Sequence, residues 1–275
     1  MDRDIGRREF PIWLLGDSNP PQWQSQLRSP FDPRHPVRHN IWTSVLDVIQ
    51  DTVYREARLR VETHYIYIRN AVEDPNVKPA QDDVEWSRDL ENEVSELRLL
   101  LKKSSPRLLL SFGAFSFEFA RRALRQQPVH HYHYWTTRRL GAEFRARAAG
   151  FDPLSVNALP LLHRSIAAGR FMQSHSHFCD DPDGNYSDLV GSSIADLLLQ
   201  HRDALPVWVG LTTHARSEVR EPPCPIEGVE EGPTTASRRA NPAISPILQQ
   251  PARHPPRHTD TTPQSRHQVG RARPP

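Results

Sequence analysis

Four short apolar runs in this chain each stop at a cluster of polar or small residues. The clusters contain carboxylate, amide and imidazole side chains, which can hold water, transfer protons or hydrogen-bond a polar ligand. If the runs are buried parallel strands, the clusters lie together beyond the carboxyl ends of the strands, where open α/β sheets bind ligands. In chain order, the runs and the clusters after them are Ile12–Leu15 before Gly16–Pro20, Tyr65–Ile68 before Arg69–Asn70, Leu108–Leu110 before Ser111–Gly113, and Leu159–Leu162 before His163–Ser165.

Helical patterns alternate with these runs. Strand and helix in alternation predict an α/β fold, in which a mainly parallel sheet is covered by helices on both faces. Ser87 suits an N-cap and Ser104–Pro106 a helix stop. In the helix after Gly113, aromatic residues line one face and arginines, Arg121 and Arg122 among them, line the other. The predicted helices span 44–53, 87–104, 114–124, 138–147 and 189–201.

Composition limits the class of protein. The 275 residues carry a formal net charge of +2, which neither requires nor excludes a polyanionic partner, and the two cysteines are too few for a disulfide scaffold. The sequence has no apolar run of membrane-spanning length and no signal-type segment, so we expect a soluble intracellular protein. We expect one domain over residues 1–212 and a disordered tail, rich in proline and arginine, over residues 213–275.

The order and character of the four clusters resemble the uracil-DNA glycosylase superfamily. Its first motif is a glycine closely followed by Asp-Pro, Asn-Pro or Ala-Pro, and here Gly16 to Pro20 reads Gly-Asp-Ser-Asn-Pro. Its second strand commonly ends in an asparagine, here Asn70, and its closing His-Pro-Ser is similar to His163–Ser165. The resemblance covers residues 10 to about 203. It implies a three-layer α/β/α domain with a short, mainly parallel, four-stranded central sheet.

The resemblance also implies roles for individual residues around a base flipped out of DNA. Asn19 would position the attacking water, and Asp17 is a possible base, because an amide cannot take a proton from water at neutral pH. His163 would donate a hydrogen bond to the departing base, and Asn70 would recognise the edge of that base. The other implied contacts are Gly16 and Trp23 (or Phe31) at the base, Ser165 at a phosphate, Ile166 or Phe171 as a wedge in the base stack, and Arg164 and Arg170 near the DNA backbone.

Two departures from the family pattern and several structural roles leave alternatives open. One extra residue separates Gly16 from Asn19, and Arg164 replaces the usual proline of the closing motif. Asn19 also suits a turn before a proline, Asn70 can satisfy backbone groups at a strand end, and His163 can be a packed histidine.

Two other polar clusters fit structural roles better than metal binding. The run His130–Trp135 has histidines at ligand spacing, but no carboxylate or thiol nearby in the sequence completes a shell, so we interpret it as an aromatic, partly exposed loop. Its rings, with Arg138 and Arg139, are an alternative contact for nucleic acid. The segment around Asp180–Asn185 lacks the closing glutamate of a calcium-binding loop and is interpreted as a polar turn.

The resemblance therefore implies an enzyme without metal or cofactor, monomeric and acting on lesion-containing or single-stranded DNA in the cytoplasm, nucleoid or nucleus. It would hydrolyse the N-glycosidic bond of uracil or a related damaged base. The first alternative is a module of the same fold that binds nucleic acid or a nucleobase without cutting it. A second is a different hydrolase that uses Asp17, His163 and Ser165. The sequence has no glycine-rich phosphate-binding motif of an NTPase or a dehydrogenase.

Overall fold

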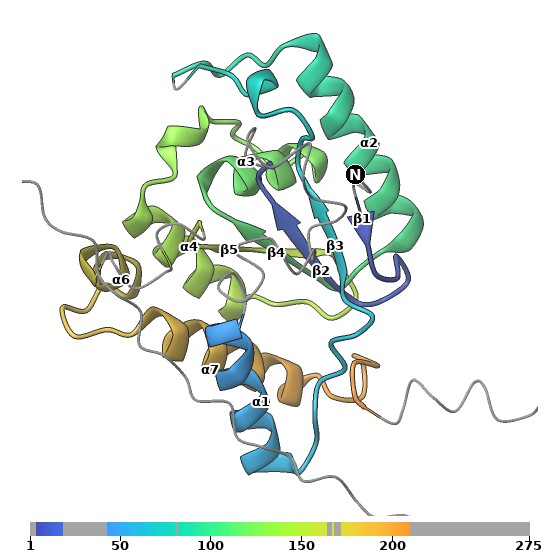
Figure 1. The fold of residues 1–275 in the computed structure, drawn as a ribbon, viewed down its shortest axis with the longest axis vertical. Helices are drawn as coiled ribbons and strands as arrows, with labels where there is room; N and C mark the ends of the chain where they lie inside the picture. The colour runs from blue at the N-terminus through green and yellow to red at the C-terminus, as the bar shows by residue number, and fades with distance from the viewer. Residues whose placement is uncertain (1–3, 19–42, 81, 164–166, 168–171, 210–275) are drawn as a thin grey trace, which may run out of the picture. The chain divides into compact units, whose positions relative to one another are not determined.

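A five-stranded sheet organises the computed structural model, which describes residues 4–18, 43–80, 82–163, 167 and 172–209 (Figure 1). Strand order is β1-β3-β2-β4-β5; β1 is antiparallel to β3, and all other neighbours are parallel. The predicted α/β fold is thus confirmed, with one short edge strand beyond the four expected. The strands are β1 (Asp4–Ile5), β2 (Ile12–Gly16), β3 (Tyr67–Asn70), β4 (Leu108–Phe112) and β5 (Asn157–Leu161).

Six helices of the described residues flank this sheet. The predicted start and stop signals of α2 are confirmed: Leu90 N–H donates to Ser87 Oγ at 3.3 Å, and Ser105 follows the helix with a left-handed φ of 48°. The helices are α1 (Thr43–Ala57), α2 (Arg88–Ser104), α3 (Ala114–Ala123), α4 (Thr137–Ala149), α6 (Met172–Cys179) and α7 (Tyr186–Gln200).

Alternate residues of the strands point to different helices. Ile12 and Leu108 face α1 and α7, and a small apolar cavity there is also lined by Ile49 and Ile194. Arg69 points to the opposite face, where its guanidinium lies 3.5 Å from the carboxylate of Glu96 on α2. Figure 1 shows α1 and α7 together on one side of the sheet, with α2 and α3 on the other. The sheet is therefore the middle layer.

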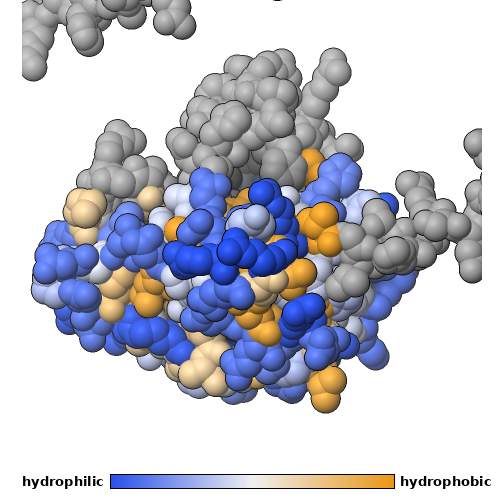
Figure 2. All heavy atoms as spheres, turned by 90° about the horizontal axis from the view of Figure 1, so that it is seen from below, coloured by the Kyte–Doolittle hydropathy of each residue, from blue (hydrophilic) through white to orange (hydrophobic). Residues whose placement is uncertain are grey.

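The surface of the described residues has single apolar side chains rather than one large patch. Leu99 and Leu154 are 67% and 79% exposed, and they lie on different elements. On the face seen in Figure 2, hydrophilic residues predominate, and hydrophobic residues are scattered among them. Scattered exposure of this kind is ordinary for a folded domain and gives no reason to place a partner there.

Helix α3 differs from the amphipathic helix that the sequence predicts. Phe115 and Phe119 are buried as expected, but Arg121 and Arg122 on the other face are buried as well, at 4% and 8% exposure. Their burial is possible because Glu118, on the same helix, is fully buried between them and accepts hydrogen bonds from both. The helix is therefore enclosed by protein on both faces.

Candidate functional site

Asn70 and Gly16 pair at the carboxyl ends of β3 and β2. A Cβ atom on Gly16 would lie 2.3 Å from Asn70 Oδ1, so the amide of Asn70 lies directly against the glycine. The chain beyond β3 stays beside the end of β2, because Ala71 N–H and Val72 N–H donate to Gly16 O and Asp17 O. Any side chain at residue 16 would displace the amide of Asn70, which explains why this position is a glycine.

His163 and Gly113 make the corresponding contact after β5 and β4. A Cβ atom on Gly113 would lie 2.9 Å from His163 Cβ, and the glycine has a φ of +92°, which side chains disfavour. Gly113 is also the N-cap of α3, where no side chain of the described residues caps the helix. The positive end of the helix dipole therefore lies next to His163.

The backbone before His163 is fixed by a buried tyrosine. Leu162 N–H donates to the hydroxyl of Tyr186 at 3.1 Å. Tyr186 is 2% exposed, and the rings of Phe178 and His175 pack against it. The start of the loop that carries His163 is thus held by a side chain from α7.

Asn70 and His163 each lie against a glycine at, or just beyond, the carboxyl end of one of the two central strands. Asn70 belongs to β3 but lies against the end of β2, whereas His163 follows β5 but lies against the residue after β4. Since β2 and β4 are neighbours, only a gap of about one strand spacing, roughly 5 Å, separates the two glycines sideways. An amide and an imidazole therefore both lie at the carboxyl edge of the sheet, each against a glycine.

Asp17, the next residue after Gly16, lies at the same edge and pairs with a lysine. Lys78 Nζ is 2.5 Å from Asp17 Oδ1, and the two side chains are only 25% and 17% exposed. The ammonium group of Lys78 also lies 5.4 Å from the centre of the Phe115 ring. An ion pair requires the ionised carboxylate, which is the form that can accept a proton from water.

Tyr132 reaches the neighbourhood of Asp17 from a different part of the chain. It begins a 3-10 turn, Tyr132–Tyr134, and its ring lies edge-on to Phe115 with the centroids 5.6 Å apart. Burial and the negative charge of Asp17 both raise the pKa of Tyr132. Lys78 and Phe115 were not expected at the site, because they reach the edge from outside the four polar clusters. The rings of the 130–135 run were an alternative contact for nucleic acid, but the sequence did not place Tyr132 at this edge.

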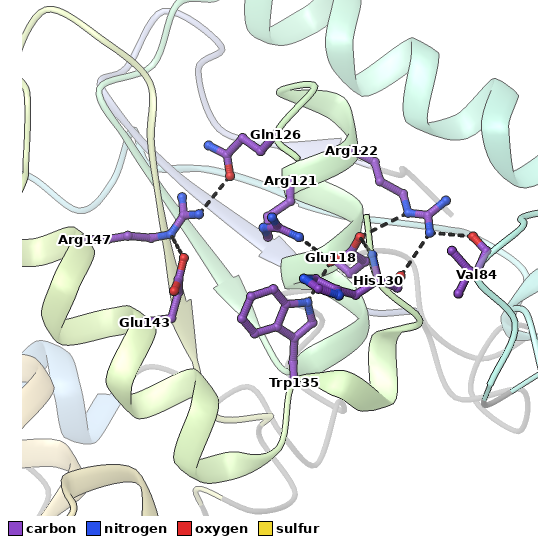
Figure 3. A network of polar contacts seen from close by, with 9 residues as sticks. All are labelled: Val84, Glu118, Arg121, Arg122, Gln126, His130, Trp135, Glu143 and Arg147. Atoms are coloured by element: carbon purple, nitrogen blue, oxygen red, sulfur yellow. Dashed lines mark hydrogen bonds and ion pairs between the residues drawn. The ribbon is translucent and has the colours of Figure 1, made fainter. Parts of the chain in front are cut away.

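The loop that carries Tyr132, residues 130–135, is held at both ends by the buried carboxylate of Glu118 (Figure 3). Glu118 Oε1 accepts from the backbone N–H of His130 at 2.9 Å, and Oε2 accepts from the indole N–H of Trp135 at 2.7 Å. The guanidinium groups of Arg121 and Arg122 complete its shell at 2.9 and 3.3 Å. The interpretation of this run as partly exposed holds for its middle, but Trp135 is buried.

Arg122 ties the same loop to the segment before α2. Its Nη2 donates to the carbonyl oxygens of Val84 and His130 at 2.7 and 3.0 Å (Figure 3). Its Nη1 lies 3.3 Å from Glu91 Oε1. The guanidinium carbon is 3.8 Å from the centre of the Trp86 ring. This set of contacts makes the 130–135 loop a fixed part of the domain.

Several residues implied by the resemblance lie outside the described residues. Gly16, Asp17, Asn70 and His163 are described, and the structure brings them to one edge of the sheet. The structure places none of the others, nor the predicted tail, whose boundary at 213 falls beyond the last described residue. The site residues outside the described part are Asn19, Trp23, Phe31, Arg164, Ser165, Ile166, Arg170 and Phe171.

Metal binding finds no support in the described part of the chain. No three His, Cys, Asp or Glu residues there lie close enough to hold an ion. The segment interpreted as a polar turn contains such a turn: Asp183 N–H donates to Asp181 Oδ1 at 3.0 Å, and Asn185 caps α7 by accepting from Ser187 N–H at 2.9 Å.

Among the described residues, no helix is both long and apolar enough to cross a membrane. Neither the known family models nor the curated proteins contain a match to this chain.

Proposed function

We propose that this protein hydrolyses the N-glycosidic bond between uracil, or a related damaged base, and the sugar in DNA. The observation that carries the proposal is the placement of Asn70 against Gly16 and of His163 against Gly113 at one edge of the sheet, with the carboxylate of Asp17 at the same edge. A planar base can rest on bare backbone between an amide and an imidazole. The carboxylate of Asp17 can accept a proton from the attacking water.

The reaction needs stabilisation at two places. As the bond between C1′ of the sugar and the base nitrogen breaks, positive charge grows on the sugar and negative charge on the base. His163 lies beside the N-terminus of α3, and both a donor N–H and the helix dipole favour a negative base. Asp17 favours the positive sugar and accepts the proton of the water that attacks C1′.

Asn70 supplies recognition rather than proton transfer. Its amide presents a donor and an acceptor side by side, which matches the alternating carbonyl and N–H groups along the edge of uracil. The contact with Gly16 fixes where that amide lies before any ligand binds. A preformed amide of this kind reduces the ordering cost of binding.

The experiment incubates the purified protein with a single-stranded oligonucleotide that contains one uracil and detects abasic sites by alkaline cleavage. We expect cleavage by the wild type and a loss of about 100-fold or more in His163→Ala and Asn70→Ala. His64→Ala is the matched control, because His64 is exposed and precedes the amino end of β3, at the opposite edge of the sheet. Its activity should equal that of the wild type.

Three outcomes contradict the proposal in different ways. If the wild type binds the oligonucleotide but never cleaves it, the fold is a binding module. If it neither binds nor cleaves, the protein does not act on uracil in DNA. If His163→Ala and Asn70→Ala retain full activity with an unchanged melting temperature, the site has been assigned to the wrong residues.

A further inference from the structure

Tyr132 belongs to the same continuous set of side chains as Asp17. Phe115 connects them: it lies edge-on to Tyr132 at 5.6 Å, and Lys78, the ion-pair partner of Asp17, lies over it at 5.4 Å. Phe115 itself is only 4% exposed, whereas Tyr132 is half-buried. Tyr132 is therefore the aromatic residue of this set that remains available to a ligand.

The hydroxyl of Tyr132 is a hydrogen-bond donor under ordinary conditions. Burial and the nearby charge of Asp17 raise the pKa of Tyr132, so the phenol keeps its proton well above neutral pH. A neutral phenol beside a carboxylate offers the ligand a donor on the side of the site where Asp17 offers an acceptor. The two groups are chemically complementary to a ligand with both donors and acceptors.

The position of Tyr132 is also fixed before a ligand binds. Glu118 accepts a hydrogen bond from His130 on one side of Tyr132 and from Trp135 on the other. Because Glu118 is fully buried and its oxygens receive four hydrogen bonds, this attachment cannot shift without breaking buried polar contacts. Preorganisation of this kind is what a contact residue needs.

We infer that Tyr132 contacts the bound nucleotide, with its ring covering the base and its hydroxyl donating a hydrogen bond to it. The inference rests on the proposed function and adds a recognition residue from the α3–α4 connection. Glu118 is then a positioning residue, which acts on the ligand only through the 130–135 loop.

The test measures equilibrium binding by fluorescence anisotropy. The probe is a single-stranded oligonucleotide with one 2′-fluoro-2′-deoxyuridine, whose glycosidic bond resists cleavage because fluorine disfavours positive charge at C1′. We expect Tyr132→Leu to weaken binding by about 5- to 100-fold, the usual effect of removing one base–aromatic contact. Tyr132→Phe, which keeps the ring, should weaken it by about 2- to 10-fold through the lost hydrogen bond.

Tyr134→Phe is the matched control. Tyr134 lies in the same turn, but its ring packs on His130 at 3.8 Å and under the guanidinium of Arg139 at 4.0 Å, so we expect unchanged affinity. Equal affinity of the wild type, Tyr132→Phe and Tyr132→Leu overturns the inference and leaves the proposed function intact. If Tyr132→Leu fails to fold, Tyr132→Phe alone decides. A wild type that binds no oligonucleotide contradicts both.

Discussion

Gly16→Ala tests whether the position of Asn70 matters for function. Residue 16 ends a β-strand, a conformation that alanine adopts readily, so the effect comes from the added methyl group. That methyl would lie 2.3 Å from Asn70 Oδ1. Since an ordinary carbon–oxygen contact is about 3.4 Å, the amide has to move by roughly 1 Å.

The displacement predicts a larger effect on activity than on stability. Overpacking of one methyl group costs about 1–3 kcal/mol of unfolding free energy, part of which the amide relieves by rotating away. A misplacement of about 1 Å in a recognition group can reduce catalysis by about 100-fold. Urea denaturation gives the first quantity, and the uracil-excision rate gives the second.

Gly150→Ala is the matched control for this change. Gly150 follows α4, and a Cβ atom there would meet nothing closer than Ala146 O at 3.4 Å, so stability and activity should both stay near those of the wild type. The reasoning is refuted if Gly16→Ala excises uracil at the wild-type rate, because the amide would then have moved without consequence.

Three further predictions concern the groups that support the site and the sheet. Tyr186→Phe leaves Leu162 N–H without its acceptor, so calorimetry should show that the unfolding free energy falls by about 1–3 kcal/mol. Uracil excision should also slow, because His163 directly follows Leu162. Glu118→Gln removes the negative charge between the two buried guanidinium groups, so urea denaturation should show that the unfolding free energy falls by about 3–5 kcal/mol. A smaller decrease would mean that water reaches the guanidinium groups. Burial, then the hydrogen bond to Asp4, raise the pKa of Tyr67 from 10.0 to about 12, so its contribution to unfolding free energy is complete below pH 10 and lost as pH rises through 12. The decline should be shallower in Tyr67→Phe, and an identical pH profile would contradict the assignment.

The sequence predicts the framework of the fold because the framework depends on local patterns. The four apolar runs supply the parallel strands, although β3 begins at Tyr67 and includes Arg69 and Asn70, which were expected to follow it. Ser87 caps α2, as its position before an acidic first turn indicates. The two-residue edge strand β1 was not expected, since two residues carry no readable period. The convergence of Asn70 and His163 at one edge also follows from strand order, which the pattern of parallel crossovers restricts.

The contacts around Asp17 could not be predicted, because they join segments far apart in the sequence. Nothing local distinguishes Lys78 from any surface lysine, or Tyr132 from the other rings of its aromatic run. Glu118 and Arg122 are charged residues of an apparently amphipathic helix, a pattern that ordinarily indicates exposure. Only the three-dimensional arrangement shows that they neutralise one another in the interior.

Gly16 and Gly113 lie at a part of the carboxyl edge whose width is set by the backbone and not by side chains. The hydrogen-bonded ladder of β2 and β4 ends at Leu15 and Ser111, just before the two glycines, and its spacing is the same whatever residues the strands contain. Amino-acid replacements next to the two glycines can therefore alter the chemistry of the site, while the spacing of β2 and β4 stays constant. A descendant of this chain that accepted a bulkier ligand would have to reshape the connecting loops, because the sheet itself cannot widen.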